Sequence, residues 1–107
     1  MGTDYIKDLK DISIDRYDFA DYKHLFKLPK IAMSHVSVKP GGQVPSHVHD
    51  NEEQTYWIIS GKGKIRLGNE EYDVKGGQAV YIPLGTEHTI KNTGEEPLEY
   101  VFFAAIV

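Results

Sequence analysis

The sequence has no cysteine, no cluster of basic residues and no long apolar run, and each absence excludes a class of protein. Without cysteine, its 107 residues cannot form a disulfide scaffold, a thiol nucleophile or a cysteine-ligated zinc or iron–sulfur site. Twelve Lys and Arg against 16 Asp and Glu give a formal net charge of −4, which argues against a nucleic-acid partner. Because no apolar stretch is long enough to span a bilayer and the first residues do not resemble a secretory signal, we expect no membrane partner and a cytoplasmic location.

The composition that remains fits one small domain. Forty per cent of the residues are apolar and 11% are aromatic, enough to bury a core, although a domain of this size has only marginal stability. Any chemistry must come from histidines, carboxylates, amides or hydroxyls.

Short apolar segments separated by glycine and proline predict an all-β fold. The segments are rich in Val, Ile, Tyr and Phe, and their spacing favours an antiparallel sandwich or barrel. Gly68-Asn69 lies between two of them and predicts a tight hairpin turn, because glycine in first place suits the mirror-image turns that match strand twist. The predicted strands cover residues 31–39, 54–60, 64–67, 72–75, 79–82, 88–91 and 98–107.

The two ends of the chain have different patterns. Residues 1–30 scatter apolar side chains among charges, so we expect an irregular arm that packs on the barrel or on a partner subunit, with the barrel itself formed by residues 31–107. Residues 100–107 are apolar on both faces of a strand, which is typical of a strand covered on both sides. This segment predicts either a central barrel strand or a strand with one face buried by a second subunit, and we expect a homodimer.

Two of the five histidines, His47 and His49, stand two positions apart. On an extended backbone both rings project from one face, so the pair can bind one metal ion, although such pairs are also common by chance. His24 lies in the arm between two lysines, and we expect it to be a solvated surface residue. His35 lies on the strand 31–39 and shares a face with Met33.

The wider spacing around these histidines resembles the two motifs of the cupins. Gly41 is followed after five residues by His47-Val48-His49, after four more by Gln54 and after six more by Gly61, which matches the first motif except that glutamine replaces its usual glutamate. The second motif matches without a gap in Gly77, Pro83-Leu84-Gly85, His88 and Asn92. The resemblance implies a double-stranded β-helix, or jelly-roll barrel, that holds one divalent metal on inward side chains.

The metal ligands that the resemblance implies are His47, His49, Gln54 and His88. Glu53 remains an alternative to Gln54, because a slip of one residue along a strand reverses the side-chain facing. Three imidazoles and one side-chain oxygen suit Mn, Fe, Ni, Cu or Zn, and the sequence does not distinguish among them. A neutral amide in place of a carboxylate leaves the ion's charge uncompensated, so we expect a stronger Lewis acid, a preference for anionic ligands and weaker metal retention.

The resemblance implies a metal-dependent enzyme that acts on a small oxygen-rich molecule by dioxygenase, isomerase or lyase chemistry. The alternatives are a small-ligand-binding module without catalysis, and a cupin that opens unsaturated uronate sugars in sugar acid catabolism. The uronate enzymes also use an acidic side chain on a late strand, where this chain has only Glu99. Candidate catalytic residues are Tyr56 and His35, and the expected substrate-binding residues are Tyr56, Ile58, Met33, His35 and Phe102.

Overall fold

A computed structural model describes residues 5–107, which form two antiparallel sheets. The six-stranded sheet has the order β1-β2-β3-β10-β5-β8 and the four-stranded sheet the order β4-β9-β6-β7. The strands are β1 (Asp15–Arg16), β2 (Ala20–Lys27), β3 (Ile31–Val38), β4 (Gln43–His47), β5 (Glu52–Ser60), β6 (Lys62–Leu67), β7 (Glu70–Lys75), β8 (Ala79–Ile82), β9 (His88–Asn92) and β10 (Leu98–Ile106).

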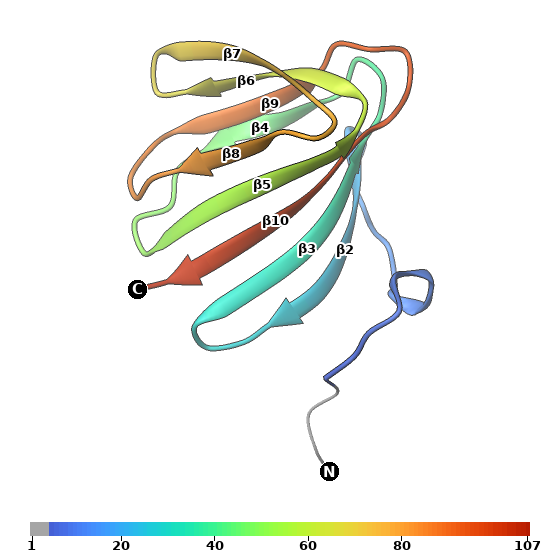
Figure 1. The fold of residues 1–107 in the computed structure, drawn as a ribbon, viewed down its shortest axis with the longest axis vertical. Coiled ribbons are helices and arrows are strands. Elements are labelled where there is room, and N and C mark those ends of the chain that lie inside the picture. Colours follow the sequence, from blue (N-terminus) through green and yellow to red (C-terminus); the bar gives the residue numbers. More distant parts are fainter. Residues whose placement is uncertain (1–4) are drawn as a thin grey trace.

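The two sheets enclose the core, as Figure 1 shows, with β4, β9, β6 and β7 forming one layer and β2, β3, β10, β5 and β8 the other. The prediction of an all-β fold is confirmed. Side chains alternate as period-two strands require: on β5, Gln54, Tyr56 and Ile58 are buried while the residues between them are exposed. The main apolar core residues are Val36, Val38, Val44, Tyr56, Ile58, Ile65, Ile82, Ile90, Leu98 and Tyr100.

The predicted hairpin and one motif residue show how turns hold the sheets together. β6 and β7 pair from Lys62↔Lys75 to Leu67↔Glu70, and Gly68 between them has a φ of 60°, a region that glycine adopts without strain.

Asn92, 1% exposed, donates hydrogen bonds to the carbonyls of Val38 and Glu96 at 2.9 and 2.8 Å. This asparagine of the second motif therefore joins the two sheets.

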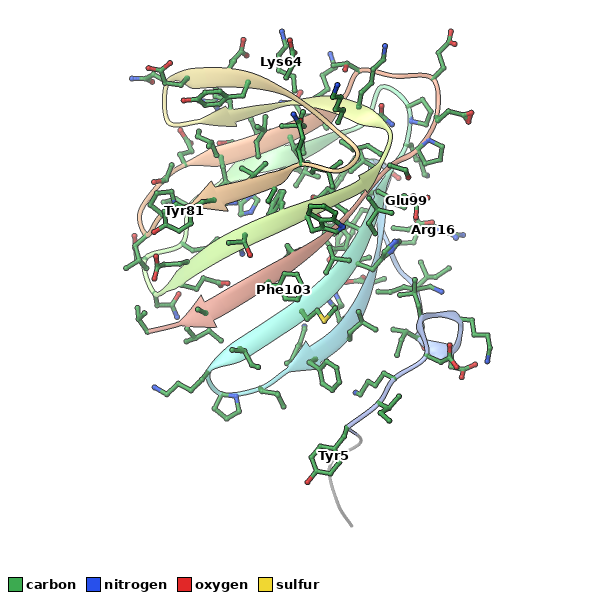
Figure 2. All side chains as sticks on the ribbon, in the orientation of Figure 1. Tyr5, Arg16, Lys64, Tyr81, Glu99 and Phe103 are labelled. Atoms are coloured by element: carbon green, nitrogen blue, oxygen red, sulfur yellow. The ribbon has the colours of Figure 1, made fainter. Side chains whose placement is uncertain are left out.

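The N-terminal arm is shorter than the predicted residues 1–30. β2 pairs along β3 from Ala20↔Val38 to Lys27↔Ala32, so it belongs to the larger sheet. The reason is that residues 20–27, which we expected to belong to an irregular arm, alternate at strand spacing, with Ala20 buried and Tyr22 packed against the core. Of the described residues, only 5–14 keep an irregular path, with a 3-10 turn at Leu9–Asp11, and Tyr5 lies on the part that extends away from the barrel (Figure 2).

β10 is a central strand, as its apolar sequence predicts. It pairs with β3 on one side and β5 on the other. Leu98, Tyr100 and Ala104 on its inner face are buried, whereas Phe103 on the outer face is 44% exposed. One face of β10 thus completes the core and the other is left at the surface.

No helix among residues 5–107 has the length and apolar character needed to cross a membrane.

Candidate metal centre

Three histidines meet where β4 and β9 lie side by side. His47 ends β4 and His88 begins β9, and the two are directly opposite in the strand register. His49 follows two residues after His47 in the loop that leads to β5. One ring nitrogen from each of the three lies within 4.8 Å of the other two. Strand pairing therefore brings together residues that are about 40 positions apart in the sequence.

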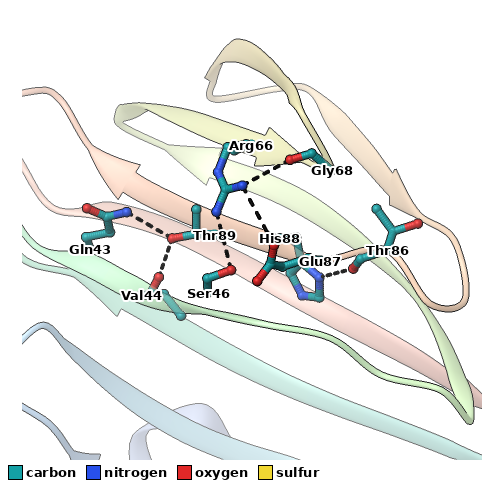
Figure 3. A network of polar contacts seen from close by, with 9 residues as sticks. All are labelled: Gln43, Val44, Ser46, Arg66, Gly68, Thr86, Glu87, His88 and Thr89. Carbon is teal, nitrogen blue, oxygen red and sulfur yellow. Dashed lines mark hydrogen bonds and ion pairs between the residues drawn. The ribbon is translucent and has the colours of Figure 1, made fainter.

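Each ring has one nitrogen occupied by an oxygen acceptor. Nδ1 of His47 donates to the carbonyl oxygen of Pro45 at 2.9 Å, and Nδ1 of His88 donates to that of Thr86 at 2.9 Å (Figure 3). Nδ1 of His49 lies 3.4 Å from Oε1 of Glu52. Because a neutral imidazole has one N–H, donation from Nδ1 leaves Nε2 of His47 and His88 with a free lone pair.

His88 supplies the clearest sign that the cluster is built for a ligand. Its side chain is buried, and Nε2 is a buried polar atom without a hydrogen-bond partner. Burial lowers the pKa of His88, and the neighbouring His47 and His49 lower it further, so the neutral form is favoured. A buried imidazole nitrogen without a partner is costly unless a cation or a donor occupies the space before it.

The histidine strands are fixed from behind by a polar network on the smaller sheet (Figure 3). The Thr89 hydroxyl donates to the carbonyl of Val44 on β4 and accepts a hydrogen bond from Gln43 at 3.1 Å. Arg66 on β6 donates to the Gly68 carbonyl at 3.0 Å and to the hydroxyl of Ser46 on β4 at 3.4 Å. These contacts connect β4, β9 and the β6–β7 turn and support the pairing that aligns His47 with His88.

The facing sheet presents Gln54 and Glu52 to the same space. Gln54 is 5% exposed on the inner face of β5, and its Nε2 donates to Oε2 of Glu52 at 3.1 Å. The amide oxygen is thereby left as the atom available to a cation. Glu53 points to the other face, where it accepts a hydrogen bond from Tyr81. Of the two residues weighed from the sequence, only Gln54 faces the histidines.

A cavity of about 410 Å³ lies before the histidines. His47, His49, Glu52 and Gln54 line it together with apolar and aromatic side chains, among them the predicted Tyr56 and Phe102. Ile58, also predicted to bind substrate, is fully buried deeper in the core and does not line this cavity. The other lining residues are Tyr22, His24, Lys27, Leu28, Ala32, Ser34, Tyr100 and Ile106.

Met33 and His35 do not belong to this site, contrary to the prediction. Met33 lies opposite Phe103 on the outer face, and His35 contacts Glu99 there, with Nε2 3.1 Å from Oε1. The physical reason is side-chain alternation along β3. Ser34 and Val36 point inward, so Met33 and His35 point outward.

Sequence reasoning missed His24 and Ser34. We expected His24 to be a solvated surface residue, but it lines the cavity, and its Nδ1 lies 2.8 Å from Oγ of the buried Ser34. The only signal in the sequence was strand alternation: once β2 is a strand, Tyr22 and His24 share the face of Ala20.

The site residues fit a first-row divalent ion. His47 and His88 each have one ring nitrogen whose lone pair is left free by a backbone acceptor on the other nitrogen, and His47, His49 and Gln54 line the same cavity. Nitrogen-rich donor sets favour Mn, Fe, Ni, Cu or Zn over calcium and magnesium, which need mostly oxygen ligands. Glu52 is the carboxylate nearest to this set, since it contacts both His49 and Gln54.

Comparison with known proteins agrees with this architecture. Residues 34–104 match the family model described as the cupin domain. The chain is 35% identical over 78 residues to an uncharacterized protein from Methanocaldococcus jannaschii and 30% identical over 71 residues to a mannose-1-phosphate guanylyltransferase from Klebsiella pneumoniae. These alignments cover 73% and 66% of this chain but 62% and 15% of the relatives, so the chain spans less than two thirds of the curated proteins it matches.

A solved structure shares the fold over nearly the whole chain. A protein from Thermotoga maritima, described as a predicted oxalate decarboxylase, superposes with a TM-score of 0.90 at 22% identity and covers 95% of this chain and 99% of its own. An uncharacterized conserved protein with a double-stranded β-helix domain from Klebsiella pneumoniae superposes with a TM-score of 0.85 at 22% identity, covering 97% of this chain and 91% of its own. The expected double-stranded β-helix is thus confirmed.

Proposed function

The chain belongs to the cupin domain family, and from that premise we propose that it is a metal-dependent enzyme acting on a small, oxygen-rich, anionic molecule. The observation that carries this proposal is the unpartnered Nε2 of His88, buried among two further imidazoles at the wall of a cavity. Fold alone does not settle function, so the argument rests on the site.

His47, His49, His88 and Gln54 would hold the ion. When bound, such an ion supplies Lewis-acid polarisation of a carbonyl or enolate oxygen. Gln54 contributes an oxygen without negative charge. The Glu52 carboxylate contacts two of the residues that would hold the ion, Gln54 and His49. The ligands alone therefore leave the ion's charge in place, which favours an anionic substrate that chelates through its own oxygens.

The cavity limits the substrate to a small molecule. A volume of about 410 Å³ lies at the lower end of ordinary ligand pockets. Lys27 at its rim adds a positive charge, and Tyr56, Tyr100 and Phe102 make the rest of the wall apolar. We propose a short carboxylic acid with a neighbouring carboxylate, hydroxyl, keto or enol oxygen, and oxalate is the first compound to test because of the Thermotoga neighbour.

The experiment has two stages. Protein purified without added ions is analysed for metal by mass spectrometry, with His47→Ala as the depleted control, and we expect near-stoichiometric metal in the native chain only. The protein loaded with each candidate metal is then incubated with oxalate and with hydroxy and keto acids, and products are followed by NMR and oxygen uptake. Absence of metal from the native chain, or equal turnover by His47→Ala, contradicts the proposal.

A second candidate is a cupin that captures the same class of ligand without converting it. The apolar wall, with Tyr56 stacked on Tyr100 at 4.5 Å between ring centroids, is the observation in its favour. Ligand binding measured by calorimetry without any product distinguishes it from the enzyme. The uronate-opening alternative has less support, since Glu99 lies on the outer face and contacts His35 instead of the cavity.

We also propose that the outer face of the larger sheet forms a homodimer interface. Trp57, Tyr81 and Phe103 are 48%, 54% and 44% exposed there, and Figure 2 shows Tyr81 and Phe103 on this side. A groove of about 510 Å³ lies between these strands and the β2–β3 turn. Exposed apolar surface of this kind commonly marks an interface. Light scattering at micromolar concentration should give a dimer for the native chain and a monomer for Phe103→Glu, and a native monomer contradicts the proposal.

A further inference from the structure

Three polar side chains on neighbouring strands form a hydrogen-bonded row from the N-terminal hairpin to the cavity. Asp15 is on β1, His24 on β2 and Ser34 on β3. Nε2 of His24 lies 3.1 Å from Oδ2 of Asp15, and Nδ1 of His24 lies 2.8 Å from Oγ of Ser34. The row is separate from the three histidines of the candidate metal centre, although both border the same cavity.

Strand register fixes this row. His24 and Ser34 are directly opposite on β2 and β3, and Asp15 is opposite Tyr22, two residues before His24 and on the same face. Arg16 binds Asp21 at 3.0 Å and holds the two-residue strand β1 against β2. The N-terminal segment that looked irregular in the sequence thus places a carboxylate behind a histidine of the cavity.

The chemistry of the three groups fixes the direction of proton donation. The hydrogen bond from His24, and another from Tyr17, lower the pKa of Asp15, so its carboxylate is ionised and only accepts. A neutral His24 must then carry its proton on Nε2, and Nδ1 accepts from the Ser34 hydroxyl. Asp15 orients the ring and would stabilise the imidazolium, the role that a carboxylate has behind a catalytic histidine in serine-type triads.

We propose that Asp15, His24 and Ser34 form an acid–base relay in which His24 takes the proton of the Ser34 hydroxyl, making that oxygen the reactive group of the cavity wall. When a hydroxy acid or enol gives its proton to Oγ of Ser34, the serine proton passes to Nδ1 of His24, and the reverse transfer returns it. Every proton is accounted for and no co-reactant is needed. Asp15 is a positioning residue because it acts only through His24.

The relay is placed where a ligand would meet it. Ser34 is 2% exposed yet lines the cavity, and His24 lines it beside Lys27. A ligand held by its anionic group near Lys27 has Ser34 and His24 on the wall of the same cavity. This assignment does not require a metal, so it goes beyond the proposed function.

Reactivity toward methanesulfonyl fluoride tests the relay without knowledge of the natural ligand. Attack by Oγ of Ser34 forms an O–S bond, fluoride leaves, and the serine proton goes to His24, so the reagent reports whether His24 can take that proton. Peptide mass spectrometry should locate the adduct on Ser34. Ser34→Ala should abolish the adduct at this peptide, and His24→Gln should slow its formation about 100-fold, the lower range for loss of a general base.

Two further variants keep the test decisive. Asp15→Asn alters an exposed carboxylate and should slow labelling while leaving the fold intact, whereas Asp18→Asn, a matched change in the adjoining turn, should have no effect. Labelling of the native chain after treatment with EDTA should proceed at the native rate, which separates this inference from the metal proposal. No adduct on Ser34 in the native protein, an undiminished rate in His24→Gln or Asp15→Asn, or loss of labelling after EDTA treatment overturns the assignment.

Discussion

The two walls of the central cavity are built in different ways. On one side, the wall consists of His47 at the end of β4 with His49 beside it, and the buried His88 lies opposite His47 on the paired strand. Backbone carbonyls orient two of the three rings. On the six-stranded sheet, the wall mixes aromatic, aliphatic and polar side chains, and its polar groups hold one another: Gln54 bonds to Glu52, and Ser34 contacts His24. The first wall is preorganised by the main chain and the second by side chains.

This difference predicts where each wall tolerates change. A ring oriented by a carbonyl within two residues keeps its orientation when distant side chains are replaced, so the placement of His47 and His88 should change little when residues of the facing wall are replaced. Replacing a polar residue of the facing wall should change metal affinity by a smaller factor than loss of a histidine, because each polar group there depends on a neighbouring side chain. The following variants test this contrast, from the largest expected effect to the smallest.

Replacing His88 by alanine should cause the greatest loss. It removes the most buried imidazole of the cluster, and we expect the affinity for Zn²⁺ to fall by more than the ~100-fold that loss of a supporting residue outside the ligand set can cause. Isothermal titration calorimetry of the metal-free protein measures the change. His35→Ala is the matched control, since His35 lies on the outer face, and equal losses in the two variants would remove the distinction between the faces.

Different substitutions of Gln54 should lower or raise the metal affinity. Gln54→Ala removes the amide oxygen and should weaken Zn²⁺ binding, whereas Gln54→Glu adds a negative charge and should strengthen it. Glu53→Ala, one residue away on the outer face, should change nothing. Calorimetry under the same conditions compares the three, and weaker binding by Glu53→Ala than by Gln54→Ala would contradict the assigned facing.

Glu52 should have an intermediate effect through its neighbours. Glu52→Gln keeps the size of the side chain but removes the charge that contacts His49 and accepts from Gln54. Supporting residues of this kind typically change metal affinity by about 10-fold to 100-fold, and we expect the lower end because part of the side chain is exposed. Competition with a chromophoric chelator measures the change, and an unchanged affinity would show that Glu52 supports neither ligand.

Tyr56→Phe should have the smallest effect and leave metal binding unchanged. The Tyr56 hydroxyl is hydrogen-bonded to that of Tyr100, and burial raises the pKa of Tyr56, so both phenols are neutral. Losing this bond should lower the free energy of unfolding by about 1 kcal/mol, measured by urea denaturation. Tyr72→Phe, at an exposed position, is the control and should leave stability unchanged. A large loss of metal in Tyr56→Phe would mean that the walls are coupled.

The same contrast explains how far the sequence could predict this molecule. His47, His49 and His88 occur at motif spacing, so the sequence predicts that they converge. His24 and Ser34 belong to no motif, and only the pairing of β2 with β3 brings them together. Met33 and His35 were assigned to the wrong face because an isolated strand sequence does not state which face is inward when both carry apolar and polar residues.

The sequence could predict the facing of Gln54 but not the contact that supports it. Its distance from Gly61 selected it over Glu53, and the alternation on β5 agrees. The support from Glu52 could not be predicted, because it depends on side-chain positions in the loop after His49 and at the start of β5.

Anomalous X-ray scattering from crystals of metal-loaded protein tests the central claim most directly. We expect one anomalous peak within bonding distance of Nε2 of His47, His49 and His88 and of the amide oxygen of Gln54. An ion bound elsewhere, or well-ordered histidines with no peak between them after loading, would contradict the account.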